Sequence, residues 1–125
     1  MNNCALIGRL TRDIELKHTA NDIAVANFTI AVDRKFKKQG EERETDFIPI
    51  VVWDKLAEFC FKYLSKGTRI GVTGEIRTRS YDAADGTKRY VTEIVASGVD
   101  FADSKPSGNG GKNQETSSQD EDFNL

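Results

Sequence analysis

The character of the chain changes abruptly after Phe101. Apolar, aromatic and charged residues interleave before that point, whereas the segment SKPSGNGGKNQETSSQ has no large apolar side chain with which to build a core. An acidic hexapeptide, DEDFNL, follows it. Of the 125 residues, roughly a hundred are therefore available for one small folded domain. We expect this domain over residues 1–102, a flexible linker over 103–119 and an acidic partner-binding tip over 120–125.

The acidic balance of the chain belongs to this last segment. The formal net charge is −2, but residues 103–125 hold two lysines and five acidic residues, which leaves 16 basic and 15 acidic residues in the expected domain. A near-neutral domain can still bind phosphate groups if its cations are clustered. The overall charge therefore does not exclude a nucleic-acid partner.

Several classes of protein are excluded by what the sequence lacks. Cys4 and Cys60 are far apart, form no CxxC motif and have only His18 as a possible companion, so we expect two reduced thiols and no metal site. No apolar run approaches the roughly 20 residues of a membrane span, and the N-terminus shows no secretory pattern. We expect a cytoplasmic protein without a cofactor, a metal or a membrane partner.

Three strands are predicted in the first half of the chain. Residues 4–10 are a short apolar run whose central Gly8 indicates a bend or a close approach of another backbone. Residues 25–33 alternate between apolar and polar side chains, as a half-buried strand does. In residues 45–53 the same period places Phe47 and Trp53 on one face and Ile48, Ile50 and Val52 on the other. Pro49 predicts an edge or a bulge in that strand.

A helix and a hairpin are predicted in the second half. Asp54 is a candidate N-cap for a helix that ends near Gly67 and carries one apolar stripe: Leu56, Phe59, Cys60, Tyr63 and Leu64. A fourth strand begins at Ile70, a turn falls at Asp85-Gly86, and residues 88–101 return as a fifth strand. With antiparallel hairpins throughout, this order predicts an all-β fold. We expect a five-stranded OB-fold barrel with one helix between strands 3 and 4, followed by a disordered C-terminal tail.

Aromatic and cationic side chains gather outside the apolar stripes. The aromatic residues are Phe36, Phe47, Trp53 and Tyr81. The cations near them are Arg34, Lys35, Lys37, Lys38, Lys55, Arg77, Arg79, Lys88 and Arg89. Unpaired bases stack on flat rings while cations contact the phosphates, so this mixture is typical of a single-stranded nucleic-acid site. A duplex reader would need a polar recognition helix, and the one predicted helix is committed to packing.

Each of these features has an ordinary explanation when taken singly. A ring on a strand is more often part of the core, the run RKFKK is more often a solvated loop, and Arg77 and Arg79 could be ordinary exposed cations. Their combination on an OB-like layout favours nucleic acid. The acidic residues between 41 and 46 are interspersed with Arg43 and indicate a solvated hairpin tip rather than a nuclease metal cluster. No nucleophile lies beside a base, so we do not expect an enzyme.

The acidic tip contains apolar residues that solubility does not require. A tethered peptide of this kind suits a basic pocket with an apolar floor on a partner protein. The residues expected to make that contact are Asp120, Glu121, Asp122, Phe123 and Leu125.

The chain resembles the bacterial and phage single-stranded DNA-binding proteins along essentially its whole length. The stretches that carry the resemblance are LIGRLTRDIELK, AVANFTIAVDR, DFIPIVVWDKLAEFCFKYLSKG, GEIRTRSYDAADGTKRYVTEIVA and the glycine-rich tail with its acidic end. The resemblance implies OB-fold subunits that assemble as homotetramers, bind single-stranded DNA and recruit replication, recombination and repair proteins through the tip. Its stacking rings fall on the four aromatic residues named above, and its cationic contacts include Lys35, Lys55, Arg77 and Arg79.

One departure from the family pattern concerns the tip. Family members typically end in an acidic run followed by Pro-Phe, whereas here Phe123 is followed by Asn124 and Leu125. This ending indicates a different set of tail partners. The residues alone leave two other readings open: an OB-fold protein-binding adaptor of a replication complex, and a barrel that binds RNA or oligosaccharide.

Overall fold

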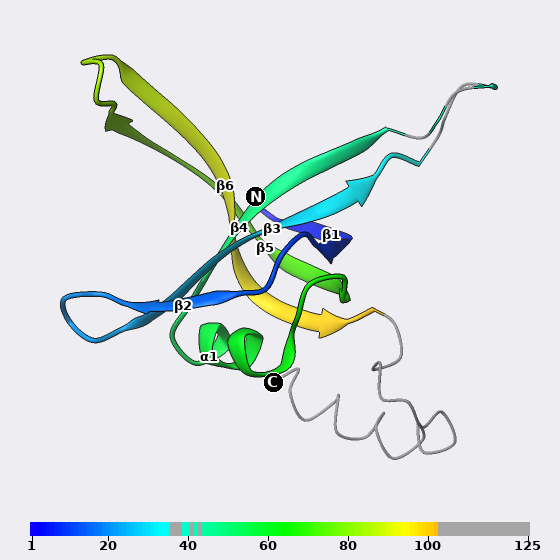
Figure 1. Cartoon of the computed structure of the whole chain (residues 1–125), viewed down its shortest axis with the longest axis horizontal. Coiled ribbons are helices and arrows are strands. Elements are labelled where there is room, and N and C mark those ends of the chain that lie inside the picture. The colour runs from blue at the N-terminus through cyan, green and yellow to red at the C-terminus, as the bar shows by residue number, and fades with distance from the viewer. Residues whose placement is uncertain (36–38, 41, 43, 103–125) are drawn as a thin grey trace.

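The computed structural model describes residues 1–35, 39–40, 42 and 44–102. It contains six strands and one helix in this part of the chain (Figure 1): β1 (Cys4–Leu10), β2 (Glu15–His18), β3 (Ala24–Asp33), β4 (Thr45–Trp53), α1 (Asp54–Tyr63), β5 (Arg69–Asp82) and β6 (Lys88–Phe101). The expected linker and acidic tip lie outside the described residues. Within those ranges, no helix has the length and apolar character needed to cross a membrane.

The strands close into a barrel. Their order in the sheet is β1-β5-β6-β4-β3-β2, and an additional pairing between β1 and β3 joins the two sides. Neighbouring strands are antiparallel except β4 and β6, which pair in parallel through Ile50 with Ile94 and Val51 with Val95. The predicted hairpins of β3 with β4 and of β5 with β6 are antiparallel as expected, whereas the parallel pairing of β4 with β6 was not predicted. The chain between β4 and β6 passes through α1 and β5, and this long connection lets the two strands run in the same direction.

The prediction of an all-β OB-fold with one helix between the third and fourth predicted strands is confirmed. The strand β2 was not predicted, because its four residues ELKH offer only Leu16 as an apolar position. It continues the path of β1 along β3: Leu10 pairs with Ile30, and Glu15 pairs with Asn27. Two additional residues on the β1–β2 side are accommodated between these pairs. β1 and β2 thus follow one continuous path along β3, with an irregular segment at residues 11–14 between them.

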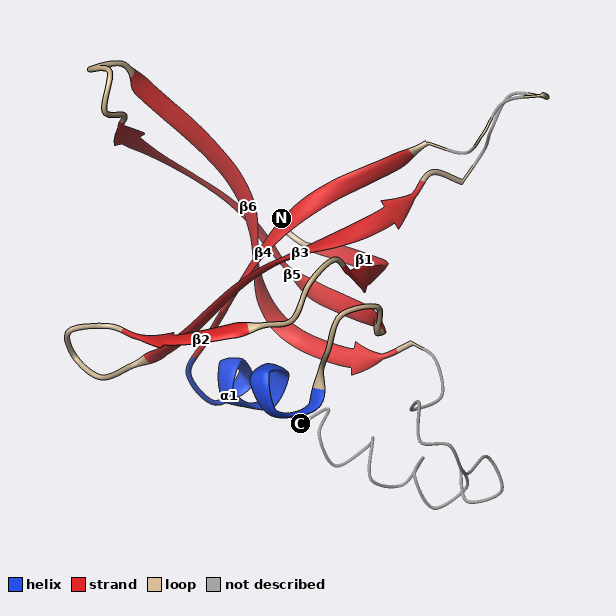
Figure 2. Ribbon diagram, in the orientation of Figure 1, coloured by secondary structure: helices blue, strands red, loops and turns tan. Residues whose placement is uncertain are grey.

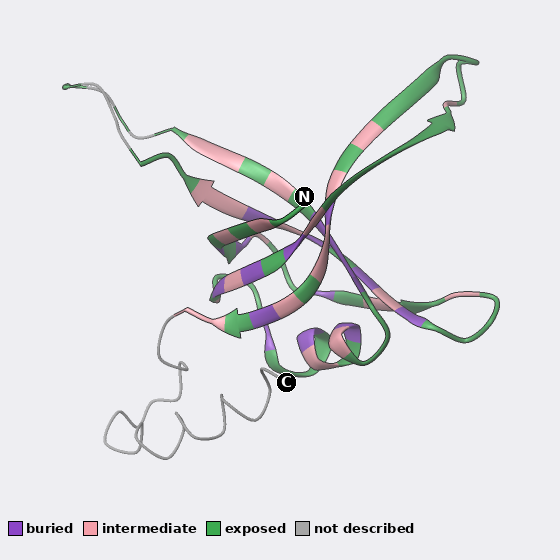
Figure 3. Cartoon of the chain, turned by 180° about the vertical axis from the view of Figure 1, so that it is seen from behind, coloured by how far each residue is buried: buried purple, intermediate pink, exposed green. Residues whose placement is uncertain are grey.

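The predicted inner faces form the core. Ile30, Ile50, Val52 and Ile70 are fully buried, and no described residue with a polar or charged side chain is buried. The helix α1 covers one end of the barrel (Figure 2) and contributes the buried residues Ala57 and Cys60 to the same cluster. Alternation of buried and exposed positions along the strands is visible in Figure 3. The apolar side chains that alternation assigned to the interior therefore hold the fold together.

The ends of α1 differ from the prediction. Trp53 occupies the N-cap position in an extended conformation and makes no side-chain cap, whereas Asp54 has a φ of 62° and is the first helical residue. Asp54 is not the N-cap because a cap residue needs an extended backbone. The helix ends at Tyr63, before Gly67, since Leu64 turns to an extended conformation and is buried in the core. Gly67 does adopt the left-handed conformation, with a φ of 89°, but in the turn that follows the helix.

Two hairpins extend beyond the barrel. Pairing of β1 with β5 stops at Cys4 and Gly74, whereas the β5–β6 ladder continues to Asp82 and Lys88. We call residues 76–93 the β5–β6 arm; Gly86, with a φ of 87°, lies in its turn as predicted. The described ends of β3 and β4, which pair out to Asp33 and Thr45, form the β3–β4 arm. Figure 1 shows the two arms diverging from the barrel.

Gly8 provides a test of this packing. A Cβ atom at Gly8 would lie 2.7 Å from the Ala31 carbonyl oxygen, a backbone atom that cannot move away cheaply. We expect Gly8→Ala to lower the free energy of unfolding by about 1–3 kcal/mol, the usual cost of overpacking. Denaturant unfolding followed by circular dichroism measures this.

Gly71 is the matched control, because it lies in the adjacent pair of the same ladder and a Cβ there would meet its nearest atoms at 3.9 Å. We expect Gly71→Ala to change stability by less than about 0.5 kcal/mol. Equal losses in the two variants would contradict the close approach described at Gly8.

Candidate nucleic-acid interface

Three of the four predicted stacking rings are exposed. Phe47 and Trp53 project from the outer face of β4 with 65% and 44% of their surface exposed, and Tyr81 near the end of β5 is 49% exposed. Phe47 pairs with Ala31 and Trp53 pairs with Val25, so the two rings stand about 20 Å apart along the strand at ~3.3 Å per residue. The fourth ring, Phe36, lies outside the described residues. The strand period therefore placed Phe47 and Trp53 on the correct face.

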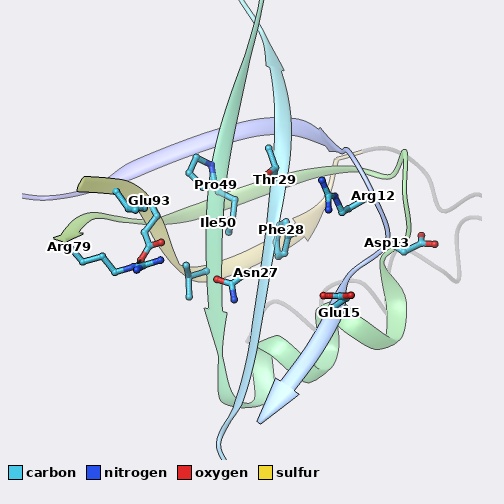
Figure 4. A pocket seen from close by; sticks show the side chains of 12 residues that line it. Arg12, Asp13, Glu15, Asn27, Phe28, Thr29, Pro49, Ile50, Arg79 and Glu93 are labelled. Carbon is cyan, nitrogen blue, oxygen red and sulfur yellow. Dashed lines mark hydrogen bonds and ion pairs between the residues drawn. The ribbon is translucent and has the colours of Figure 1, made fainter. Parts of the chain in front are cut away.

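A cleft of about 390 Å³ lies between the barrel and the β5–β6 arm. Its apolar lining includes Pro49 and Val51 of β4 and Val91 of β6. Its polar lining comes from three parts of the chain (Figure 4): Arg12, Asp13 and Glu15 around the break between β1 and β2; Asn27 and Thr29 on β3; and Arg79 and Glu93 on the arm. The cleft thus combines apolar contact area with polar side chains and with charged side chains of both signs.

The cleft and the rings belong to one surface. Side chains alternate along β4, so Pro49 and Val51 share the outer face with Phe47 and Trp53 and lie between them. Arg79 and Tyr81 likewise share one face of β5, with Arg79 in the cleft lining and Tyr81 nearer the end of the arm. An extended ligand that runs along β4 from one ring to the other therefore passes the cleft and Arg79.

Arg34 is occupied by carboxylates rather than open to solvent. Its Nε and Nη2 atoms donate to the two oxygens of Asp46, each at 3.1 Å, and its Nη1 donates to Glu44 at 3.1 Å. The hydrogen bonds from Arg34 lower the pKa of the Asp46 carboxyl group below its ordinary value, and the same contacts raise the pKa of Arg34. Arg34 therefore holds the two strands of the β3–β4 arm together at their outer described end in the unbound protein.

The three predicted arginines on the β5–β6 arm are also paired with carboxylates. Arg77 contacts Glu75, Arg79 donates to Glu93 at 3.2 Å, and Arg89 donates to Asp85 at 3.3 Å. The predicted lysines Lys35, Lys55 and Lys88 are exposed. The Arg77–Glu75 and Arg89–Asp85 pairs are exposed on both sides, and exposed ion pairs contribute about 0–1 kcal/mol, so a phosphate group can replace either carboxylate at small cost. The Glu93 side chain, in contrast, is only 11% exposed. Positive and negative side chains balance on this surface, and a phosphate can take the place of an exposed carboxylate as the partner of an arginine.

Sequence reasoning missed three residues of the cleft and one exposed ring on the other face of the β5–β6 arm. Arg12, Asp13 and Glu15 reach the cleft because the first strand is interrupted there, and no sequence motif marks that interruption. Tyr90 is 77% exposed and lies opposite Ser80. Alternation along residues 88–92 could have found it, since it places Tyr90 with Lys88 on the face of the arm opposite to Tyr81.

The groups that could support metal or thiol chemistry are few. In the part of the chain that the structure describes, no three His, Cys, Asp or Glu side chains gather as a metal site would require. Cys4 and Cys60 are unpaired, and burial raises the pKa of the Cys60 thiol to about 12. A thiol with so high a pKa is protonated at neutral pH and packs as an apolar side chain.

The closed barrel, with exposed rings beside a polar cleft, defines an OB-fold binding domain. The chain belongs to the single-strand binding protein family, whose model matches residues 1–102. It is 64% identical over 102 residues to a protein of Clostridium acetobutylicum named single-stranded DNA-binding protein 3, a match that covers 81% of this chain and 70% of the relative. The single-stranded DNA-binding protein of Clostridium tetani is 58% identical over the same shares of the two chains. That of Halalkalibacterium halodurans is 52% identical over 114 residues, 90% of this chain and 68% of the relative.

The clasp between Arg34 and Asp46 predicts a pH dependence. Because folding lowers the pKa of Asp46, the ion pair stabilises the β3–β4 arm at pH values above the ordinary aspartate pKa of 3.8, and this contribution is lost as the pH falls through the lowered value. In Arg34→Gln the pKa of Asp46 should move upward toward 3.8. Titration of the Asp46 carboxyl carbon by NMR measures this, and the same midpoint in both proteins would rule out the clasp.

Proposed function

We propose that the protein binds single-stranded DNA with little sequence specificity. The observation that carries this proposal is the surface on which the exposed rings of Phe47 and Trp53 flank the cleft, with Arg79 and Tyr81 on the neighbouring arm. Membership of the single-strand binding protein family supports it, as do the names of the relatives.

The contacts follow from the chemistry of an unpaired strand. Bases stack on Phe36, Phe47, Trp53 and Tyr81, and each stacked base contributes about 1–3 kcal/mol without reading its edge. Phosphates contact the cations around the rings: Arg34, Lys35, Lys55, Arg77, Arg79, Lys88 and Arg89. The apolar floor of the cleft accepts the flat parts of any nucleotide. Because rings and phosphate contacts tolerate every base, the binding has little sequence preference.

The wider role includes protection of the strand and recruitment of other proteins. The protein acts in the cytoplasm as a homotetramer, as the family resemblance implies. Its tip residues Asp120, Glu121, Asp122, Phe123 and Leu125 bind replication, recombination and repair proteins. A short acidic peptide with apolar side chains supports weak and exchangeable contacts of this kind.

Phe47 and Phe61 provide a test of the stacking surface. Both rings are exposed, 65% and 52%, but Phe61 is on α1 and is not among the residues that line the cleft. We expect Phe47→Ala to weaken binding of an oligo(dT) by about 5- to 100-fold, the loss of one stacked base, and Phe61→Ala to leave it unchanged. Quenching of Trp53, the single tryptophan, reports the binding.

The same titration tests the whole proposal. Affinity should fall as the salt concentration rises, because binding releases the cations condensed on the phosphates. Absence of quenching and of any change in oligonucleotide mobility at low salt would reject single-stranded DNA as the ligand. A stronger response to RNA or to an oligosaccharide would redirect the proposal to that ligand.

The acidic tip gives a separate expectation. We expect it to compete with DNA for the cationic surface, so that removal of residues 103–125 tightens DNA binding severalfold at low salt. The matched variant replaces Asp120, Glu121 and Asp122 by their amides and keeps the length of the chain. Unchanged or weaker affinity in both variants, measured by anisotropy of a labelled oligonucleotide, would argue against such competition.

A further inference from the structure

The cleft contains a carboxylate where a polyanion is expected to bind. The side chain of Glu93 is only 11% exposed and lines the cleft. A carboxylate in this place repels phosphate, and its partial burial adds a desolvation cost. The repulsion opposes DNA binding and the desolvation lowers the stability of the folded domain, so the position of Glu93 requires a compensating interaction.

The interaction that the structure shows is with Arg79. The Nε atom of Arg79 donates to a carboxylate oxygen of Glu93 at 3.2 Å. Arg79 pairs with Val91 across the ladder and Glu93 pairs with Arg77, so the contact runs diagonally between β5 and β6 on one face of the arm. Figure 4 shows the two side chains together at one side of the cleft, with Arg12, Asp13 and Glu15 at the other side. Glu93 thus fixes one edge of the guanidinium group.

The other arginines expected to contact phosphate are more fully engaged. Arg34 uses Nε and both terminal nitrogens on Asp46 and Glu44. Arg77 and Arg89 each use Nε and one terminal nitrogen. Arg79 donates through Nε alone, so within the described residues both of its terminal nitrogens are without a partner. These are the nitrogens with which a guanidinium group forms paired hydrogen bonds to a phosphate.

We propose that Glu93 is a positioning residue for DNA binding: it holds Nε of Arg79 so that the two terminal nitrogens are presented to a phosphate in the cleft. This inference rests on the proposed function. A free arginine side chain loses rotational freedom when it binds, and a side chain that is already held loses less. Glu93 therefore increases affinity although its own charge repels the ligand.

Glu93 weakens binding through its charge and strengthens binding by holding Arg79, so substitutions at this position can separate the two effects. Glu93→Ala removes both the acceptor and the charge, and we expect binding of an oligo(dT) to weaken by about 3- to 10-fold. Glu93→Gln keeps an acceptor for Nε and removes the charge, so its binding should be at least as tight as that of the unchanged protein. If Glu93 acted by charge alone, both variants would bind more tightly.

A second background separates positioning from a structural role. In Arg79→Ala there is no guanidinium to hold, so the additional change Glu93→Ala should leave binding unchanged or tighten it. A purely structural role would weaken binding by the same factor in both backgrounds and would lower the melting temperature of Glu93→Ala and Glu93→Gln alike. Either of these results would overturn the proposal.

Glu75 is the matched control, because it also pairs with an arginine next to the cleft but is not among the residues that line it. We expect Glu75→Ala to bind as tightly as the unchanged protein or more tightly, so a loss equal to that of Glu93→Ala would count against a specific role. Failure of the proposed function is distinguishable, since the unchanged protein would then bind no oligonucleotide at all.

Discussion

Closure of the sheet is the constraint on which the rest of the structure depends. The pairings of β1 with β3 and of β4 with β6 turn an open sheet into a barrel, so one face of every strand must be apolar. The other face lies outside the core of the barrel, and on β4 it carries the exposed Phe47 and Trp53 with the buried Val51 between them. The two arms begin where the pairings with β1 and β6 run out. The candidate interface therefore follows from the way in which a small barrel buries one face of each strand.

The charge of the interface is balanced by internal pairing. Three arginines on the β5–β6 arm and one at the outer described end of the β3–β4 arm contact carboxylates on the same hairpins. These pairs leave the unbound surface near neutral, which agrees with the charge of the domain in the sequence. They also offer cations that a phosphate can take over at little cost. A strongly positive patch is not needed for a surface of this kind.

Local patterns predicted what depends on local geometry. The period of two assigned the inner faces of β3 and β4 and the outward direction of Phe47 and Trp53, because a strand fixes side-chain direction regardless of its neighbours. The parallel pairing of β4 with β6, the strand β2 and the lining of the cleft by Arg12 and Asp13 depend on contacts between distant segments. The carboxylate partners of the arginines also escaped prediction. Which of several nearby acids an arginine selects is decided by register, which the sequence does not state.

Trp53 links two elements, since it is both the last residue of β4 and the N-cap of α1. Its backbone cannot shift without disturbing the helix that follows, whose Ala57 and Cys60 belong to the core, and Phe47 is likewise fixed by its place in the ladder. The distance between the Phe47 and Trp53 backbone positions is therefore set by the barrel. Under the proposed function the ligand must adapt to that length, which a flexible strand does by bending and unstacking. Under the same proposal a stiff duplex, which does not bend and unstack in this way, would be a poorer ligand than an unpaired strand.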